Sequence, residues 1–359
     1  MYQRYARRLW RDKKPLLGRC GGNPYHARVI NNRKTPMKKI LLAALFAAST
    51  LPALAGTELL NASYDIAREL FVRYNALYQK EHPDVKITQS HAGSSKQANA
   101  ILQGLKADVV TFNQVTDIDV LAQKGKLLPD NWRERLPYHS SPYYSTTAFL
   151  VRKGNPKHIE DWGDLVKDGV EIVFANPKTS GNGRYAYLGA LGYAQDAFKS
   201  EAEQHDFLKK LLGHVKVSDT GGRGATTSFV ERKIGDVLIT FESEVHGIRQ
   251  EYGADGYDVV IPKVSILAEF PVAWLDKNTN AKGTTDAAKT YLEYLYSEPA
   301  QRLLAENHYR VRDEKIAAEY KERFPEVQLK TVEDIGGSWE KVMKEHFNNG
   351  GLLDQLQKR

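Results

Sequence analysis

The sequence predicts an α/β protein of two lobes, each built on a mostly parallel sheet flanked by helices. From Glu58 onward, short apolar runs typical of strands alternate with stretches of helical periodicity, a pattern that favours parallel sheets with helices on both faces. About 300 residues follow a predicted leader, which suits two lobes better than one oversized sheet. Several strand ends are also followed by loops rich in glycine, serine and threonine.

The predicted strands are apolar runs bounded by turn residues. They are Glu58–Tyr64, Val85–Ser90, Asp108–Phe112, Ala148–Arg152, Val170–Ala175, His214–Ser218, Val237–Phe241, Tyr257–Ile261 and Pro271–Leu275.

Helices are predicted between most of these strands. One begins at Asp65, a residue suited to the N-cap position, and carries Leu70 and Tyr74 on one apolar face. An amphipathic helix is expected at Asp286–Tyr296, and a charged helical tail over residues 306–359.

The amino-terminal region predicts a secretory signal peptide at residues 37–55. A basic start at Met37-Lys38-Lys39 precedes a short apolar run and an A-x-A cleavage site that ends at Ala55. The apolar run is shorter than the roughly 20 residues that a membrane span requires. Residues 1–36 are interpreted as upstream sequence from a start codon called too early, and the mature protein is expected in the periplasm.

The basic charge of the chain belongs to this leader. Residues 1–55 carry a net charge of +11, so the total of +7 leaves −4 for the mature chain. A basic nucleic-acid-binding arm is the rival interpretation, but a leader placed behind such an arm makes little sense, and we expect no nucleic-acid partner. The single cysteine, Cys20, also lies upstream, which predicts a mature protein without disulfide or thiol chemistry.

Four strand-to-helix joints share one chemistry. Each places Gly, Ser or Thr where a helix begins, leaving unpaired N–H groups that can bind an anion at the carboxyl edge of a sheet. The joints are Asn61–Asp65, His91–Gln97, Thr179–Gly183 and Asp219–Thr227. Any single joint is more often ordinary turn chemistry, and only their repetition favours a site.

Other motifs are incomplete. The glycines near residues 181 and 222 lack the dinucleotide-binding spacing, and no P-loop is formed. Glu242, Glu244 and His246 resemble metal ligands, but such charges after a strand are more often a solvated edge. No metal and no cofactor are therefore predicted.

Seven stretches resemble the periplasmic sulfate/thiosulfate-binding proteins of bacterial ABC importers. The resemblance covers nearly all of residues 57–359. Its motifs are Leu59–Asp65, Gln89–Gln97, Phe149–Pro156, Asn176–Gly181, Asp219–Gly224, Ile266–Pro271 and His346–Gly351.

The resemblance implies a type II periplasmic binding protein that holds a dehydrated oxyanion with neutral donors in its interlobe cleft. The donors carried over by motif are the amides of Asp65, Gly181, Asn182 and Gly222, together with Ser94 and the Ser180 hydroxyl. Asn182 and Gly222 stand where relatives have Gly and Ala, but an amide donor survives either change. The carboxylate of Asp65 is expected to turn away from the anion and cap its helix.

One departure concerns ligand preference. The sulfate-binding branch has a tryptophan N–H donor at the position of Phe241, which can donate nothing. Phe241–Val245 and Ala268–Trp274 resemble the thiosulfate-binding branch, and an apolar ring suits the large terminal sulfur of thiosulfate. Arg184 and Arg223 flank the loops, where they either polarise peptide groups behind the donors or lie in solvent.

The predicted organisation divides the mature chain at a hinge. Lobe I comprises residues 56–146 and 263–305, lobe II comprises residues 147–262, and the tail at 306–359 packs on the lobes. Closure of this hinge would bury the ligand and mark the loaded form for a permease.

The predicted function is capture of thiosulfate and sulfate for an inner-membrane ABC permease by a monomeric, non-enzymatic protein. The alternatives are an exported serine hydrolase using Ser94 or Ser180, and a binding protein for molybdate or an organic anion. A hydrolase would need a histidine base beside its serine, and only His91 lies near Ser94 in the sequence.

Overall fold

The computed structural model describes residues 56–358. The predicted signal peptide at residues 37–55, the upstream segment 1–36 and Cys20 lie outside the described residues.

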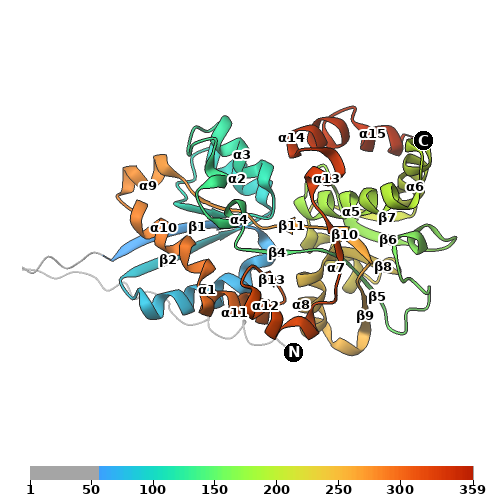
Figure 1. Cartoon of the computed structure of the whole chain (residues 1–359), viewed down its shortest axis with the longest axis horizontal. Coiled ribbons are helices and arrows are strands. Elements are labelled where there is room, and N and C mark those ends of the chain that lie inside the picture. Colours follow the sequence, from blue (N-terminus) through green and yellow to red (C-terminus); the bar gives the residue numbers. More distant parts are fainter. Residues whose placement is uncertain (1–55, 359) are drawn as a thin grey trace, which may run out of the picture. The chain divides into compact units, whose positions relative to one another are not determined.

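The first main sheet has four strands in the order β12-β3-β1-β2, and its neighbours β1 and β2 lie side by side in Figure 1. The central strand β1 is parallel to β2 and β3, whereas β12 is antiparallel to β3. The strands span Thr57–Ser63 (β1), Val85–His91 (β2), Val109–Thr111 (β3) and Val272–Trp274 (β12). All four predicted strands of this region are confirmed, with ends shifted by at most one residue.

Helices flank this sheet along the chain. The first begins as a 3-10 turn, Asp65–Ala67, and continues as α1, whose predicted inner face at Leu70 and Tyr74 is buried. The helices are α1 (Arg68–Glu81), α2 (Ser94–Leu102), α3 (Val115–Gln123), α4 (Pro137–Ser140), α9 (Asp276–Lys282), α10 (Thr285–Glu293) and α11 (Glu298–Glu306).

The second main sheet has five strands in the order β7-β6-β8-β5-β9. β6 is parallel to β7 and β8, but β5 is antiparallel to both of its neighbours. The sheet is therefore mixed, because β5 enters from the first half of the molecule in the opposite direction. The strands are β5 (Thr147–Arg152), β6 (Ile172–Ala175), β7 (Val215–Asp219), β8 (Val237–Phe241) and β9 (Tyr257–Val260).

Four helices accompany the second sheet: α5 (Gly181–Ala197), α6 (Glu201–Gly213), α7 (Gly222–Val230) and α8 (Glu242–Tyr252). Helix α5 is buried along most of its length, and Gly189 lets it approach Trp162, since a Cβ there would lie 2.8 Å from the indole ring. Helix α6 begins with a capping box in which Ser200 and Glu203 satisfy each other's backbone amides.

Five short strands were not predicted from the sequence. They form a three-stranded sheet, β11-β4-β13, and a two-stranded pair, β10-β14. Their bounds are β4 (Tyr143–Ser145), β10 (Val264–Ile266), β11 (Ala268–Glu269), β13 (Arg310–Val311) and β14 (Gln328–Lys330). These runs of two or three residues are too short to show a period of two, and pairing partners distant in sequence define them. β3 and β12, which also have three residues, lie within longer, mostly apolar runs.

The tail is helical as predicted, apart from β13 and β14. Helix α13 contacts α5, and α15 contacts α6, so the end of the chain covers the helices of the second sheet. The tail contains α12 (Glu314–Glu319), α13 (Val332–Gly336), α14 (Trp339–Val342), a π-helical turn (Met343–Phe347) and α15 (Leu352–Gln357). The remaining 3-10 helices are Trp132–Glu134, Trp162–Val166, Ala254–Gly256, Tyr294–Tyr296 and Lys321–Arg323.

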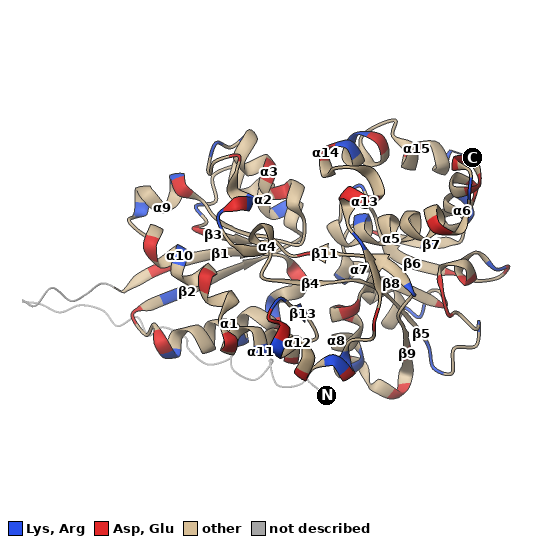
Figure 2. Cartoon of the chain, viewed as in Figure 1, with Lys and Arg blue, Asp and Glu red and all other residues tan. Residues whose placement is uncertain are grey.

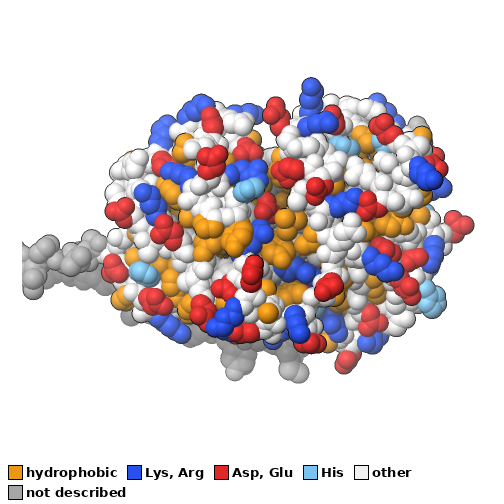
Figure 3. Space-filling view, viewed as in Figure 1, with side chains coloured by type: hydrophobic (Ala, Val, Ile, Leu, Met, Phe, Trp, Pro, Cys, Tyr) orange, Lys and Arg blue, Asp and Glu red, His pale blue; other side chains and the backbone are white. Residues whose placement is uncertain are grey.

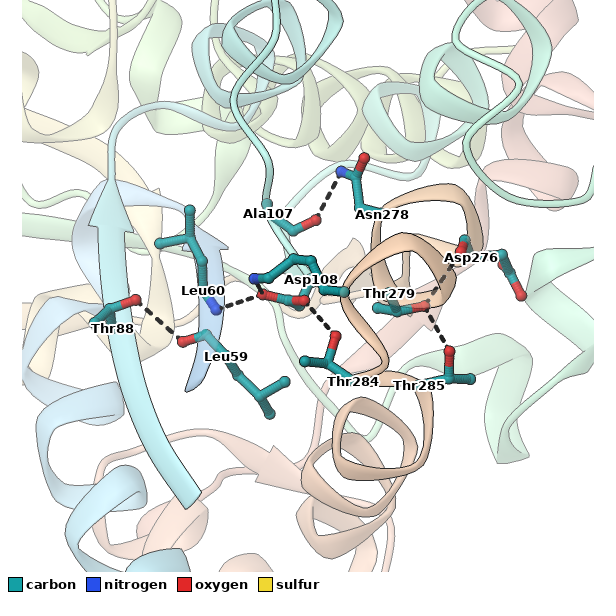
Figure 4. Close-up of polar contacts among 11 residues, drawn as sticks. Leu59, Leu60, Thr88, Ala107, Asp108, Asp276, Asn278, Thr279, Thr284 and Thr285 are labelled. Carbon is teal, nitrogen blue, oxygen red and sulfur yellow. Dashed lines mark hydrogen bonds and ion pairs between the residues drawn. The ribbon is translucent and has the colours of Figure 1, made fainter. Parts of the chain in front are cut away.

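A polar cluster fixes the amino end of β3 (Figure 4). The carboxylate of Asp108 is fully buried and accepts hydrogen bonds from the Leu60 amide (2.8 Å) and the Thr284 hydroxyl (2.6 Å), and it pairs with Lys282. Beside it, Asn278 Nδ2 donates to the carbonyl oxygen of Ala107 at 2.8 Å. These bonds join β1, β3 and the α9 region.

Charges of both signs are interspersed over the described residues (Figure 2). In the face shown in Figure 3, acidic and basic side chains alternate and hydrophobic side chains gather near the middle. Within residues 56–358, none of the helices has the length and apolar character required to cross a bilayer.

Candidate functional site

A small cavity lies where loops from the two main sheets meet. Its lining residues come from Asp65 and Ile66, from Gly93 and Ser94, from Asn113, from Thr179 through Asn182, and from Thr220 through Gly222. These segments follow β1, β2, β3, β6 and β7 respectively, so each comes after the carboxyl end of a parallel strand. Ligands of open α/β sheets bind at this edge.

Six of the seven predicted ligand residues line this cavity: Asp65, Ser94, Ser180, Gly181, Asn182 and Gly222. The four predicted joints therefore converge. The volume is about 20 Å³, on a measure by which one water molecule needs roughly 10–15 Å³. This arrangement suits a small ion better than an extended organic molecule.

Free main-chain donors surround the cavity. Ser94 opens α2, Gly181 and Asn182 open α5, and Gly222 opens α7. Among residues 56–358, no acceptor pairs with the amides of these four residues or of Asp65. The first amides of a helix lack intrahelical partners and carry partial positive charge, so they favour an anion.

The two serine hydroxyl groups differ. Ser180 is the N-cap of α5 and accepts from the Gly183 amide, which leaves its proton free to donate towards the cavity. The Ser94 hydroxyl accepts from the Asn113 amide (3.1 Å) and donates to Asn113 Oδ1 (2.7 Å), so only its main-chain amide is free. In the described residues, neither hydroxyl is hydrogen-bonded to a histidine.

Asp65 does not occupy the predicted N-cap position. Tyr64 is the N-cap residue and makes no side-chain capping bond, whereas Asp65 is the first residue of the 3-10 turn. Its Oδ1 accepts from the Ile66 amide at 3.1 Å, and its Oδ2 lies 3.8 Å from where a Cβ on Gly221 would stand. The carboxylate is thus bonded locally but also faces the loop before α7.

The predicted solvated edge at Glu242, Glu244 and His246 is wrong. Glu242 is fully buried and pairs with Arg310 at 2.6 Å, and Glu244 is also buried, while His246 is half-buried. These side chains point to different partners, and in the part of the chain that is described no group of three such residues could hold a metal. The charged pattern was misread because the partner Arg310 is distant in sequence.

Glu244 accepts hydrogen bonds from three side chains behind the cavity. Thr226 Oγ1 donates at 2.8 Å, Asn182 Nδ2 donates at 3.3 Å, and Thr240 also donates. The pKa of Glu244 is raised to about 7, chiefly by burial and also by the nearby Asp65 carboxylate, whereas the bonds from Thr240 and Thr226 and the charge of Arg223 lower it. The side chain of Asn182 thus takes part in a buried network.

Phe241 is not among the residues that line the cavity. Its ring is buried and packs edge-on against Phe270 at 5.2 Å between centroids and near Tyr185 at 5.9 Å. Phe270 in turn stacks on Tyr64, the residue before Asp65. Phe241 therefore belongs to an aromatic cluster that extends to the start of the first joint.

The two flanking arginines lie in different surroundings. Arg184 is buried, and its Nε donates to the carbonyl oxygen of Pro177 at 3.0 Å, which fixes the loop before α5. Arg223 is exposed and lies on a wider groove beside the cavity. No lysine, arginine or histidine is present in the cavity lining formed by the described residues.

Six residues that line the cavity were not predicted as ligand residues: Ile66, Gly93, Asn113, Thr179, Thr220 and Gly221. Ile66 adjoins Asp65, and the two glycines and two threonines lie within the predicted joints. Asn113 comes from a fifth joint, after β3, which contains no glycine or serine and so lacked the signal used for the other four.

Comparisons with known proteins agree with this arrangement. The family model described as "Bacterial extracellular solute-binding protein" matches residues 59–310. The chain is 56% identical over 325 residues to the thiosulfate-binding protein of Escherichia coli (strain K12), covering 88% of this chain and 95% of the relative. It is 46% identical over 321 residues to the sulfate-binding protein of Salmonella typhimurium (strain LT2), covering 88% of this chain and 97% of the relative.

Solved structures show the fold. The sulfate-binding protein SubI from Mycobacterium tuberculosis H37Rv matches with a TM-score of 0.74 at 28% identity, covering 81% of this chain and 100% of that one. The periplasmic binding protein AfuA from Actinobacillus pleuropneumoniae matches with a TM-score of 0.61 at 16% identity, covering 83% and 97%. The predicted fold class, an α/β type II periplasmic binding protein, is confirmed, with mixed sheets.

Proposed function

Because the chain belongs to the sulfate/thiosulfate-binding family of bacterial extracellular solute-binding proteins, we propose that it captures thiosulfate and sulfate for ABC import. The family consists of solute-binding proteins and not of enzymes. The observation that carries the proposal is the convergence of unpaired main-chain amides from both sheets on one cavity whose lining has no cationic side chain in the described residues.

Neutral donors are sufficient for a small dianion. The Ser180 hydroxyl and the amides of Asp65, Ser94, Gly181, Asn182 and Gly222 supply the hydrogen bonds. Helix N-termini add partial positive charge at α2, α5 and α7. Sulfate and thiosulfate are fully ionised at neutral pH and only accept hydrogen bonds, so a lining of donors matches them.

Phosphate is expected to bind much more weakly. At neutral pH it retains a proton, which a donor-lined site leaves without an acceptor, and such a mismatch costs orders of magnitude in affinity. The Asp65 carboxylate accepts from the Ile66 amide through Oδ1, and weak phosphate binding requires that Oδ2, which faces the loop before α7, does not accept the phosphate proton.

The preference for thiosulfate is assigned to Phe241. A phenyl ring at this position supplies no donor, whereas the sulfur of thiosulfate accepts hydrogen bonds weakly and tolerates an apolar neighbour. The ring lies in the cluster with Tyr185 and Phe270, so its movement towards the cavity on closure is part of the proposal.

Delivery requires closure and a permease. Residues 56–146 with 263–305 act as lobe I and residues 147–262 as lobe II, with the hinge near the β4–β5 and β9–β10 connections. Export through cleavage after Ala55 places the monomeric protein in the periplasm, where an ABC permease distinguishes its closed form. Arg184 acts behind the donors by holding the Pro177 carbonyl, whereas Arg223 lies in solvent.

Calorimetric titration of the protein with thiosulfate, sulfate, molybdate and phosphate tests the function. We expect micromolar or tighter binding of thiosulfate and sulfate, which corresponds to about 8 kcal/mol or more, and at least about 100-fold weaker binding of phosphate. Binding of neither sulfur oxyanion, or turnover of a chromogenic ester, would contradict the proposal.

A further inference from the structure

The loop after β3 contributes a buried asparagine to the lining of the cavity. Asn113 is 5% exposed and lines the cavity, although no donor was predicted from this loop. β3 lies next to β1 in the first sheet and runs parallel to it, so its carboxyl end reaches the same edge as the Asp65 joint.

Hydrogen bonds to Ser94 fix which way this amide points. The Ser94 hydroxyl accepts from the Asn113 main-chain amide at 3.1 Å and donates to Asn113 Oδ1 at 2.7 Å. If the Asn113 amide were reversed, the Ser94 proton would have no acceptor among the described residues, so Oδ1 faces Ser94 and Nδ2 points away. Nδ2 carries two N–H groups and has no acceptor in residues 56–358.

The same amide contacts the helix terminus on the other side of the cavity. A Cβ added at Gly181 would lie 2.9 Å from Asn113 Oδ1 and 3.0 Å from Gln114 Oε1. Gly181 opens α5 and supplies one of the proposed main-chain donors. The Asn113 side chain therefore lies against the start of α5, next to one of the proposed main-chain donors.

A second observation comes from Gln114. Its side chain is fully buried next to Gly181, yet neither Nε2 nor Oε1 has a hydrogen-bond partner within the described residues. Buried side-chain amides are almost always paired, so two consecutive amides with unused donors are unusual, and Asn113 is the one of the two that lines the cavity.

We infer that Asn113 is a further ligand-binding residue, whose Nδ2 donates a hydrogen bond to the bound sulfur oxyanion. This inference rests on the proposed function and adds a side-chain donor from lobe I to the main-chain donors. A neutral amide provides the bond without bringing a positive charge, in keeping with the other donors.

Titration of three proteins tests this role: the wild type, Asn113→Ala and Asn278→Ala. Asn278 is a matched control, because it is also a buried asparagine with a donated bond, to Ala107, but lies at the opposite end of β3 (Figure 4). Asn113→Ala is expected to bind sulfate and thiosulfate about 10- to 100-fold more weakly, the range for losing one donor to a charged acceptor. Asn278→Ala is expected to keep the wild-type affinity.

Nuclear magnetic resonance distinguishes direct contact between Asn113 Nδ2 and the anion from a purely structural role of Asn113. With selective ¹⁵N-asparagine labelling, the Nδ2 resonance that disappears in Asn113→Asp is assigned to Asn113, and sulfate should move one of its protons downfield. Retention of affinity within about twofold in Asn113→Ala, or an unmoved Nδ2 resonance in wild type saturated with sulfate, would overturn the inference alone. Wild-type protein that binds neither anion would overturn the proposed function as well.

Discussion

The two ends of strand β3 hold buried polar side chains in opposite states. At the amino end, Asp108 is bonded to Leu60, Thr284 and Lys282, and the neighbouring Asn278 is bonded to Ala107 (Figure 4). At the carboxyl end, the Nδ2 group of Asn113 and the whole amide of Gln114 lack partners in the described residues.

This difference separates polar groups that hold the fold from polar groups that meet a ligand. A buried polar group with all its hydrogen-bond partners stabilises the protein without a ligand. An unpaired buried amide costs stability unless a ligand or a water molecule accepts its hydrogen bonds. Unused donors gather at the end of the sheet where the cavity lies. The comparison predicts which substitutions change stability and which change affinity.

The largest effect is expected for Asp108→Ala, which removes the central acceptor of the bonded cluster at the amino end of β3. Removal of the carboxylate leaves the Leu60 amide and the Thr284 hydroxyl without their acceptor and Lys282 without its partner. The free energy of unfolding should fall by about 3–5 kcal/mol, as measured by urea denaturation, while sulfate affinity stays unchanged. A loss below about 1 kcal/mol would show that the cluster is not structural.

Glu244→Gln tests whether the hydrogen-bonded network around Glu244, next to the cavity, contributes to stability as the Asp108 cluster is expected to. The pKa of Glu244 is raised to about 7 from an ordinary value of 4.5, so the folded state binds the proton more tightly than the unfolded state. Wild-type stability that is present below pH 4.5 is therefore lost as the pH rises through 7. The glutamine variant lacks this loss.

The difference in the free energy of unfolding between wild type and Glu244→Gln should therefore change by on the order of 3 kcal/mol between pH 4.5 and pH 8, in favour of the variant. Urea unfolding without added anion, over a pH series, measures it. Parallel pH profiles for the two proteins would show that Glu244 does not titrate in this range.

Ser180→Ala tests a residue that both stabilises the fold and is proposed to bind the anion. The hydroxyl caps α5 and also has a proton free for the anion. We expect a 10- to 100-fold loss of sulfate affinity with about 1 kcal/mol lost from the free energy of unfolding. A stability loss without a loss of affinity would assign the hydroxyl to the cap alone.

The smallest effect is expected for Phe241→Trp, because it exchanges one aromatic ring for another in the cluster with Phe270 and Tyr185. The indole N–H adds a donor that favours oxygen over sulfur, so the thiosulfate-to-sulfate affinity ratio should fall by about threefold to tenfold. Side-by-side calorimetry measures the ratio. An unchanged ratio would remove Phe241 from the explanation of preference.

Sequence reasoning identified what local patterns determine. Strand β8 was predicted with its observed bounds, Val237–Phe241, because it is a continuous apolar run. The joints at Ser94, Ser180 and Gly222 were found through their small residues and do line one cavity. Each of these signals lies within about ten residues of chain.

What was missed depends on partners distant in sequence. Glu242 was interpreted as exposed because Arg310, which neutralises it, lies 68 residues away. Asn113 was missed because its role depends on Ser94 and on Gly181, which belongs to the other half of the molecule. Such contacts are visible only after the sheets are assembled.

The pairing of β13 and β14 has a consequence for how the protein matures. β13 (Arg310–Val311) completes a sheet with β4 (Tyr143–Ser145), and β14 (Gln328–Lys330) completes a pair with β10 (Val264–Ile266). Both pairings require residues beyond 305. A chain that is synthesised or exported amino end first therefore cannot form either sheet completely until this carboxyl-terminal segment is available. A nascent or truncated polypeptide would therefore remain incompletely assembled and open to proteases.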